Sequence, residues 1–197
     1  RDTLSAWIDA GTPEGDPASA VQITQPSEVL TNPDLEILQA APYTPVFNQN
    51  GNEYRCFILT DVPEDDYFIT AMAPIIGQPS IVHHAVLSTA HMTSLTSAHL
   101  APEGFDCYYG DGGLTNLMLA AWGPGMLPLE LPEGVGFAMN GGEALILNVH
   151  YFDPGNLKAG IADQSGYAFR TTESVDTEAY VAVWGPTDIA IPADVES

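Results

Sequence analysis

The recurrence of short apolar segments separated by turn residues most strongly constrains the fold of this chain. From Arg55 onward, stretches rich in β-branched and aromatic side chains alternate with gaps filled by Pro, Gly and Asp. Such stretches are typical of β-strands. No crossover-helix pattern separates them, which favours an all-β, antiparallel sandwich or barrel. The expected strands are Arg55–Thr60, Tyr67–Pro74, Ile81–Ser88, Leu117–Trp122, Gly134–Met139, Ala144–Tyr151, Gly166–Thr172 and Thr177–Trp184, with a short one near Ile189.

The N-terminal residues show a helical pattern instead. Leu4, Trp7 and Ile8 recur at helical spacing, and Gly11 is a suitable stop signal. The pattern predicts a short helix over Asp2–Ala10. A helix of this length is not stable alone, so we expect it to pack on another surface.

The segment from Thr12 to about Tyr43 is rich in Pro, Asp and Ser and is predicted to be an extended linker. It contains two strand candidates, Ala20–Thr24 and Leu35–Leu38. We therefore expect residues 1–43 to form a helix and linker, and residues 44–197 to form the β-sandwich domain.

The charge balance limits the classes of partner. Lys and Arg number 4 against 26 Asp and Glu, for a net charge of −22. Nucleic acid and anionic membrane surfaces are bound by clustered cations, so neither is expected as a partner. No apolar run approaches the length of a membrane span, so membrane insertion is not expected either. A cationic partner or a salty medium would suit this surface.

Three of the five histidines stand in apolar, strand-like segments: His83, His84 and His150. Imidazole is costly to bury without partners, and three imidazoles suit copper or zinc. Adjacent residues on a regular strand point to opposite faces, so His83 and His84 reach one metal only if the strand ends, bulges or twists there. The alternative is ordinary core histidines bonded to backbone or carboxylate. The other two, His91 and His99, are expected on the surface.

The two cysteines, Cys56 and Cys107, are too far apart in sequence to form a metal-binding motif. One disulfide is the preferred interpretation, and it implies a secreted or periplasmic location. The alternative is two unrelated buried thiols in a cytosolic protein. A disulfide would hold the long excursion Thr89–Thr115 beside the strand that carries the paired histidines.

The order of these motifs resembles the copper type II, ascorbate-dependent monooxygenases, the family of the peptidylglycine α-hydroxylating and dopamine β-monooxygenases. The resemblance runs from about residue 53 to residue 184. It implies the N-terminal one of two jelly-roll-like β-sandwich domains, each carrying one copper. It also implies that His83, His84 and His150 bind copper and that the two cysteines pair. The segments that carry the resemblance are His83-His84, Ala121-Trp122, Leu131–Phe137 and Leu147–Tyr151.

The resemblance implies a role in electron transfer. In this family oxygen and substrate meet at a second copper, bound by a His-x-His pair and a Met of the other domain. No His-x-His occurs in this chain, so no catalytic residue is expected here, and a second copper domain is expected as partner. The chain begins at Arg1 without a signal peptide and stops near the family's domain boundary, as expected for a processed piece of a longer protein.

Two neighbours of His150 are candidates for contacting the copper ligands, Asn148 and Tyr151. Mammalian members of the family tend to carry Gln at the position of Asn148, so this chain departs from the family there, and the resemblance does not imply an electron route through this amide. Met92, Met118, Met126 and Met139 are candidates for a soft fourth ligand, although methionine more often fills cores.

The N-terminal segment Thr3–Gly11 is similar to the final helix of small c-type cytochrome domains, although no haem-attachment motif is present. This similarity implies a redox partner such as a c-type cytochrome, and the alternative is an ordinary terminal helix. Two other functions stay open. One is a binding or scaffold domain without redox chemistry, and the other is a three-histidine zinc hydrolase, for which no general base is identified.

Overall fold

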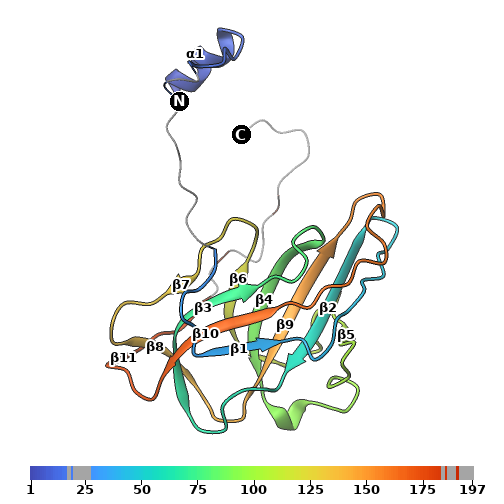
Figure 1. Ribbon diagram of the computed structural model, residues 1–197, viewed down its shortest axis with the longest axis vertical. Coiled ribbons are helices and arrows are strands. Elements are labelled where there is room, and N and C mark those ends of the chain that lie inside the picture. Colours follow the sequence, from blue (N-terminus) through green and yellow to red (C-terminus); the bar gives the residue numbers. More distant parts are fainter. Residues whose placement is uncertain (17–18, 20–27, 183–184, 186–189, 191–197) are drawn as a thin grey trace.

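The computed structural model describes residues 1–16, 19, 28–182, 185 and 190. Two β-sheets pack face to face and form a sandwich (Figure 1). The five-stranded sheet has the order β5-β2-β9-β4-β6, and all of its pairs are antiparallel. Its strands are β5 (Phe105–Asp106), β2 (Asn52–Leu59), β9 (Ala144–Phe152), β4 (Val82–Ala90) and β6 (Thr115–Trp122).

The six-stranded sheet has the order β1-β10-β3-β8-β11, and β7 also pairs with β3. Its pairs are antiparallel except for β11, which runs parallel to β8. Its strands are β1 (Leu35–Leu38), β10 (Gly166–Thr172), β3 (Tyr67–Ile75), β8 (Val135–Met139), β11 (Thr177–Glu178) and β7 (Leu129–Glu130).

The all-β sandwich predicted from the strand pattern is confirmed, with several corrections in detail. Of the predicted strand Thr177–Trp184, the described residues 177–182 form a strand only at β11, and residues 183–184 lie outside the described part. The very short strands β5 and β7 were not predicted. Strand β1 pairs with β10, so a segment assigned to the linker belongs to the sandwich. The predicted strands Ala20–Thr24 and near Ile189 lie outside the described residues.

The predicted N-terminal helix is present as α1 (Asp2–Asp9). It buries none of its residues, and Trp7 is still 46% exposed. Its indole Nε1 donates to the Pro13 carbonyl at 3.0 Å, a local contact. The expected packing of this helix is therefore not found within the described residues. Among all the residues that the structure describes, no helix is long and apolar enough to span a membrane.

Strand β9 shows how the sandwich separates two environments. Its odd-numbered residues from Leu145 to Tyr151 point into the main core between the sheets. Ile146 points the other way and packs with Cys56 and Cys107 under the excursion that joins β4 to β6. The predicted disulfide is confirmed, with Cα atoms 5.8 Å apart. It fastens the excursion to β2, on the outer face of the five-stranded sheet.

Candidate metal centre

The three strand histidines meet on the outer face of the five-stranded sheet because β4 contains a bulge. His84 pairs with His150 across β4 and β9, and Val82 pairs with Tyr151. One residue on β9 is thus matched by two on β4, and the extra residue is His83. A bulge bends a strand and redirects its side chains. It allows the adjacent imidazoles of His83 and His84 to lie on one side, which a regular strand forbids.

The imidazole nitrogens converge. Nδ1 of His84 lies 3.1 Å from Nδ1 of His83 and 3.2 Å from Nδ1 of His150. One nitrogen from each of the three rings lies within 4.8 Å of the other two. Two nitrogens about 2 Å from a shared ion, and about 100° apart around it, would be about 3.1 Å from each other. The two short separations therefore fit ligands of a single metal ion, and the three imidazoles converge closely enough to be considered as one site.

A hydrogen bond from His150 to Asn52 determines which ring nitrogen of His150 is free. Nε2 of His150 lies 2.8 Å from Oδ1 of Asn52. The amide is oriented by its own Nδ2, which donates to the Asn50 carbonyl at 2.9 Å. Because an amide oxygen only accepts, Nε2 of His150 carries the proton. The lone pair of Nδ1 is then left pointing at the other two histidines.

Burial favours the neutral form of two of the three histidines. The pKa of His150 is lowered to about 4, first by burial and then by the neighbouring His84 and His83. Burial, followed by the effect of His83, also lowers the pKa of His84. Exposure rises from His150, which is 6% exposed, through His84 to the exposed His83. Metal ligation requires unprotonated imidazole, so these shifts favour binding at mildly acidic pH.

An aromatic wall supports the buried ligand. Tyr54 lies opposite His150 in the β2–β9 register, and their rings are stacked with centroids 4.1 Å apart. Tyr108 meets Tyr54 edge-on at 5.2 Å and directly follows Cys107. The disulfide therefore fixes the part of the excursion that packs against Tyr54. Sequence reasoning missed Tyr54 and Asn52, because only the strand register brings them to a histidine about a hundred positions away.

Tyr151 and Asn148, which were expected to contact the copper ligands, have other partners. Tyr151 is turned into the core, where its hydroxyl donates to Oδ2 of Asp163 at 2.9 Å. Asn148 shares the outer face with His150 but lines a separate hollow with Cys56 and Asp111. The structure therefore places their side chains among other partners than the three imidazoles.

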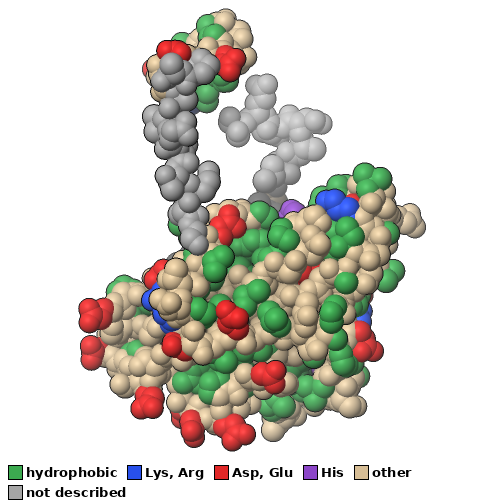
Figure 2. Space-filling model, in the orientation of Figure 1, with side chains coloured by type: hydrophobic (Ala, Val, Ile, Leu, Met, Phe, Trp, Pro, Cys, Tyr) green, Lys and Arg blue, Asp and Glu red, His purple; other side chains and the backbone are tan. Residues whose placement is uncertain are grey.

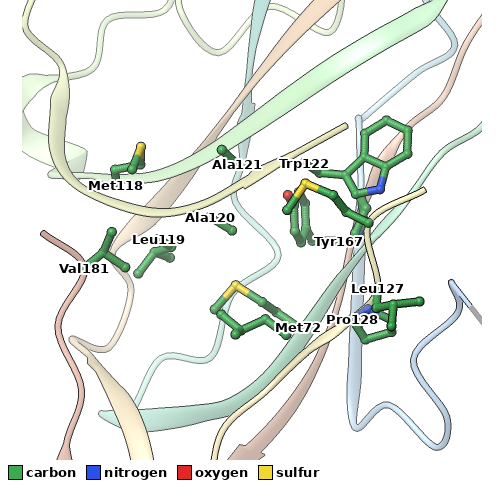
Figure 3. Close-up of a pocket in the computed structure, with 13 residues that line it drawn as sticks. Met72, Met118, Leu119, Ala120, Ala121, Trp122, Leu127, Pro128, Tyr167 and Val181 are labelled. Atoms are coloured by element: carbon green, nitrogen blue, oxygen red, sulfur yellow. The ribbon is translucent and has the colours of Figure 1, made fainter. Parts of the chain in front are cut away.

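The methionines considered as soft ligands also lie apart from the histidine cluster. Met118 and Met126 line an apolar hollow of about 350 Å³ between the sheets, together with Met72 and Trp122 (Figure 3). None of the three histidines lines this hollow. Met139 belongs to the main core, and Met92 lies in a short 3-10 helix, η2 (Met92–Ser94). Among the His, Cys, Asp and Glu side chains of the described residues, the three histidines form the candidate ligand group.

Comparison with known proteins identifies the family. The sequence profile of the copper type II ascorbate-dependent monooxygenase, N-terminal domain, matches residues 41–158. This chain belongs to that family. The match includes the three converging histidines and both disulfide cysteines, and a set of neutral imidazoles suits the family's metal.

Two longer proteins of Xenopus laevis are similar to this chain. Peptidyl-glycine alpha-amidating monooxygenase B is 27% identical over 142 residues, covering 65% of this chain and 16% of that protein. Peptidyl-glycine alpha-amidating monooxygenase A is 29% identical over 129 residues, covering 58% of this chain and 14% of that protein. The chain thus matches about a sixth of the length of these relatives.

Proposed function

We propose that this chain binds one copper ion through His83, His84 and His150 and transfers single electrons as part of a secreted copper-dependent monooxygenase. The observation that carries the proposal is the convergence of three imidazoles, with Nδ1 of His84 at 3.1 Å and 3.2 Å from Nδ1 of the other two. The family match supports copper as that ion. When bound, copper supplies one-electron redox chemistry.

The surrounding residues would hold the ligands for that chemistry. Asn52 keeps the proton of His150 on Nε2, and Tyr54 limits tilting of the same ring by stacking on it. The bulge at His83 presents a second ligand from β4, whose neighbouring residues Val82 and His84 both pair with β9. Ligands held in advance favour electron transfer, because little has to move when the charge on the metal changes.

We propose that hydroxylation needs another domain. The chain contains no His-x-His pair, and its relatives are about six times longer than the part that matches. A second copper domain is therefore the expected partner. The disulfide supports a secreted or other extracytoplasmic location, because such bonds persist in oxidising compartments.

Metal analysis and electron paramagnetic resonance of the purified chain test this function. We expect one equivalent of Cu(II), a signal that ascorbate abolishes, and no hydroxylated product from a glycine-terminated peptide. Retention of zinc in preference to copper, or a Cu(II) signal that ascorbate leaves unchanged, would contradict the redox role. Copper-dependent hydroxylation by this chain alone would contradict the assignment of a half-enzyme.

A further inference from the structure

A hollow of about 260 Å³ opens beside His83, the most exposed of the three clustered histidines. Its walls are apolar apart from Ser80, His83 and Lys158. It lies next to the proposed copper ligands, so a molecule bound there would lie beside the metal.

The charge of this hollow differs from that of the rest of the molecule. Lys158 is the only lysine in a chain with 26 acidic residues, and no Asp or Glu lines the hollow. The hollow beside Tyr54 is lined by Glu53 and Asp106, and the one beside Asn148 by Asp111. On the face drawn in Figure 2, cationic side chains are few and scattered among acidic and apolar ones. Anions are thus repelled from most of the surface but meet a cation here.

Lys158 is held at the wall of the hollow by two contacts. Its Nζ donates to the Ser80 carbonyl at 2.6 Å, and its backbone nitrogen donates to Oδ2 of Asp153 at 2.6 Å. An ammonium group has three donors, so two remain for a ligand. The cation is therefore positioned in advance and can still bind an anion.

We propose that this hollow binds the small anionic reductant of the site, a monoanion of the ascorbate class, with Lys158 as its cationic contact. The inference rests on the proposed copper function and adds the place of electron entry. In the step, ascorbate monoanion gives one electron to Cu(II). The products are Cu(I) and the ascorbyl radical anion, and the proton of the donor is released to solvent.

Binding is tested first without metal. Ascorbate is titrated under argon into the metal-free chain, and backbone amide shifts are followed by NMR. We expect shifts at Val82, His83 and Phe152 that weaken about fivefold or more in Lys158→Gln and return in Lys158→Arg. Arg170→Gln is the matched control, because Arg170 pairs with Glu130 away from this hollow. Unchanged shifts in Lys158→Gln, or shifts confined to other residues, would overturn the proposal.

Reduction of the copper-loaded chain is then measured by stopped flow at low ionic strength. We expect Lys158→Gln to slow reduction by ascorbate about fivefold and to leave reduction by neutral hydroxylamine unchanged. Equal slowing by both reductants would mean that the variant disturbs the metal and would overturn a binding role. Failure of the chain to take up copper would refute the proposed function instead, and the metal-free titration still decides whether the hollow binds the anion.

Discussion

Adjacent residues of β9, His150 and Tyr151, lead to two polar clusters on opposite faces of one strand. On the core face, both oxygens of the buried Asp163 are used. Oδ1 accepts from the Ser165 hydroxyl at 2.8 Å and from the backbone N–H of Gln78 at 2.7 Å. Oδ2 accepts from the Tyr151 hydroxyl. On the outer face, the Nδ1 atoms of the histidines face one another.

The difference separates a structural cluster from a binding one. The Asp163 carboxylate accepts from its near neighbour Ser165 and from two other segments, at Gln78 and Tyr151, so it joins parts of the sandwich and needs no ligand. In the histidine cluster Nδ1 of His150 presents a lone pair, and a cation between the three rings would let all of them act as ligands. Removing groups from the two clusters should therefore affect different properties, stability on one face and metal binding on the other.

The largest effect is expected for His150→Ala. Removing the buried ligand leaves two imidazoles, and the affinity for Cu(II) should fall roughly 100-fold or more. Loss of a residue that only hydrogen-bonds to a metal ligand already lowers metal affinity by up to about 100-fold. Competition titration with a chelator measures it. His99→Ala is the control, because His99 lies in the excursion and accepts from the Thr96 amide. Equal copper affinity in the two variants would remove His150 from the site.

Tyr151→Phe tests the other face of the same strand. The change removes a buried hydroxyl and leaves one Asp163 oxygen without its donor, so the free energy of unfolding should fall by about 1–3 kcal/mol. Urea unfolding of the metal-free chain measures this loss. Copper affinity should stay within about twofold, because the hydroxyl does not face the histidines. A large loss of copper affinity without a loss of stability would reverse the comparison.

Asn52→Leu should weaken copper binding about tenfold, because Nε2 of His150 loses the acceptor that fixes its tautomer. Asn52→Asp keeps an acceptor and should retain most of the affinity. Chelator competition on both variants checks the difference. If both variants bind copper equally poorly, the role of Asn52 is to maintain the fold of β2 rather than the tautomer of His150.

A further effect is expected in the pH dependence of stability. The pKa of His150 is lowered to about 4 by burial, from an ordinary value near 6.5. The unfolded chain therefore binds more protons between these values, and the metal-free protein should lose stability as pH falls from about 6.5 towards 4. In His150→Gln this contribution should be absent, so denaturation at several pH values should show a shallower decline. An equally steep decline would assign the titration to other groups.

The sequence predicted the β-sandwich and which three histidines are candidate metal ligands, but it did not predict the local geometry that brings them together. Patterns such as Ala144–Tyr151 depend on alternation within one segment, so they identify strands directly. The bulge at His83 depends on the register between β4 and β9, which one segment does not encode. The contacts of Asn52 and Tyr54 with His150 depend in the same way on the register between β2 and β9. Helix α1 was predicted from its periodicity, but its packing surface was not found.

X-ray absorption spectroscopy of the copper-loaded chain tests the central claim most directly. The convergence of His83, His84 and His150 predicts three imidazole nitrogens at about 2 Å from a single copper, with one of them lost in His150→Ala. A copper bound by carboxylate or thioether ligands, or a spectrum that His150→Ala leaves unchanged, would contradict the account.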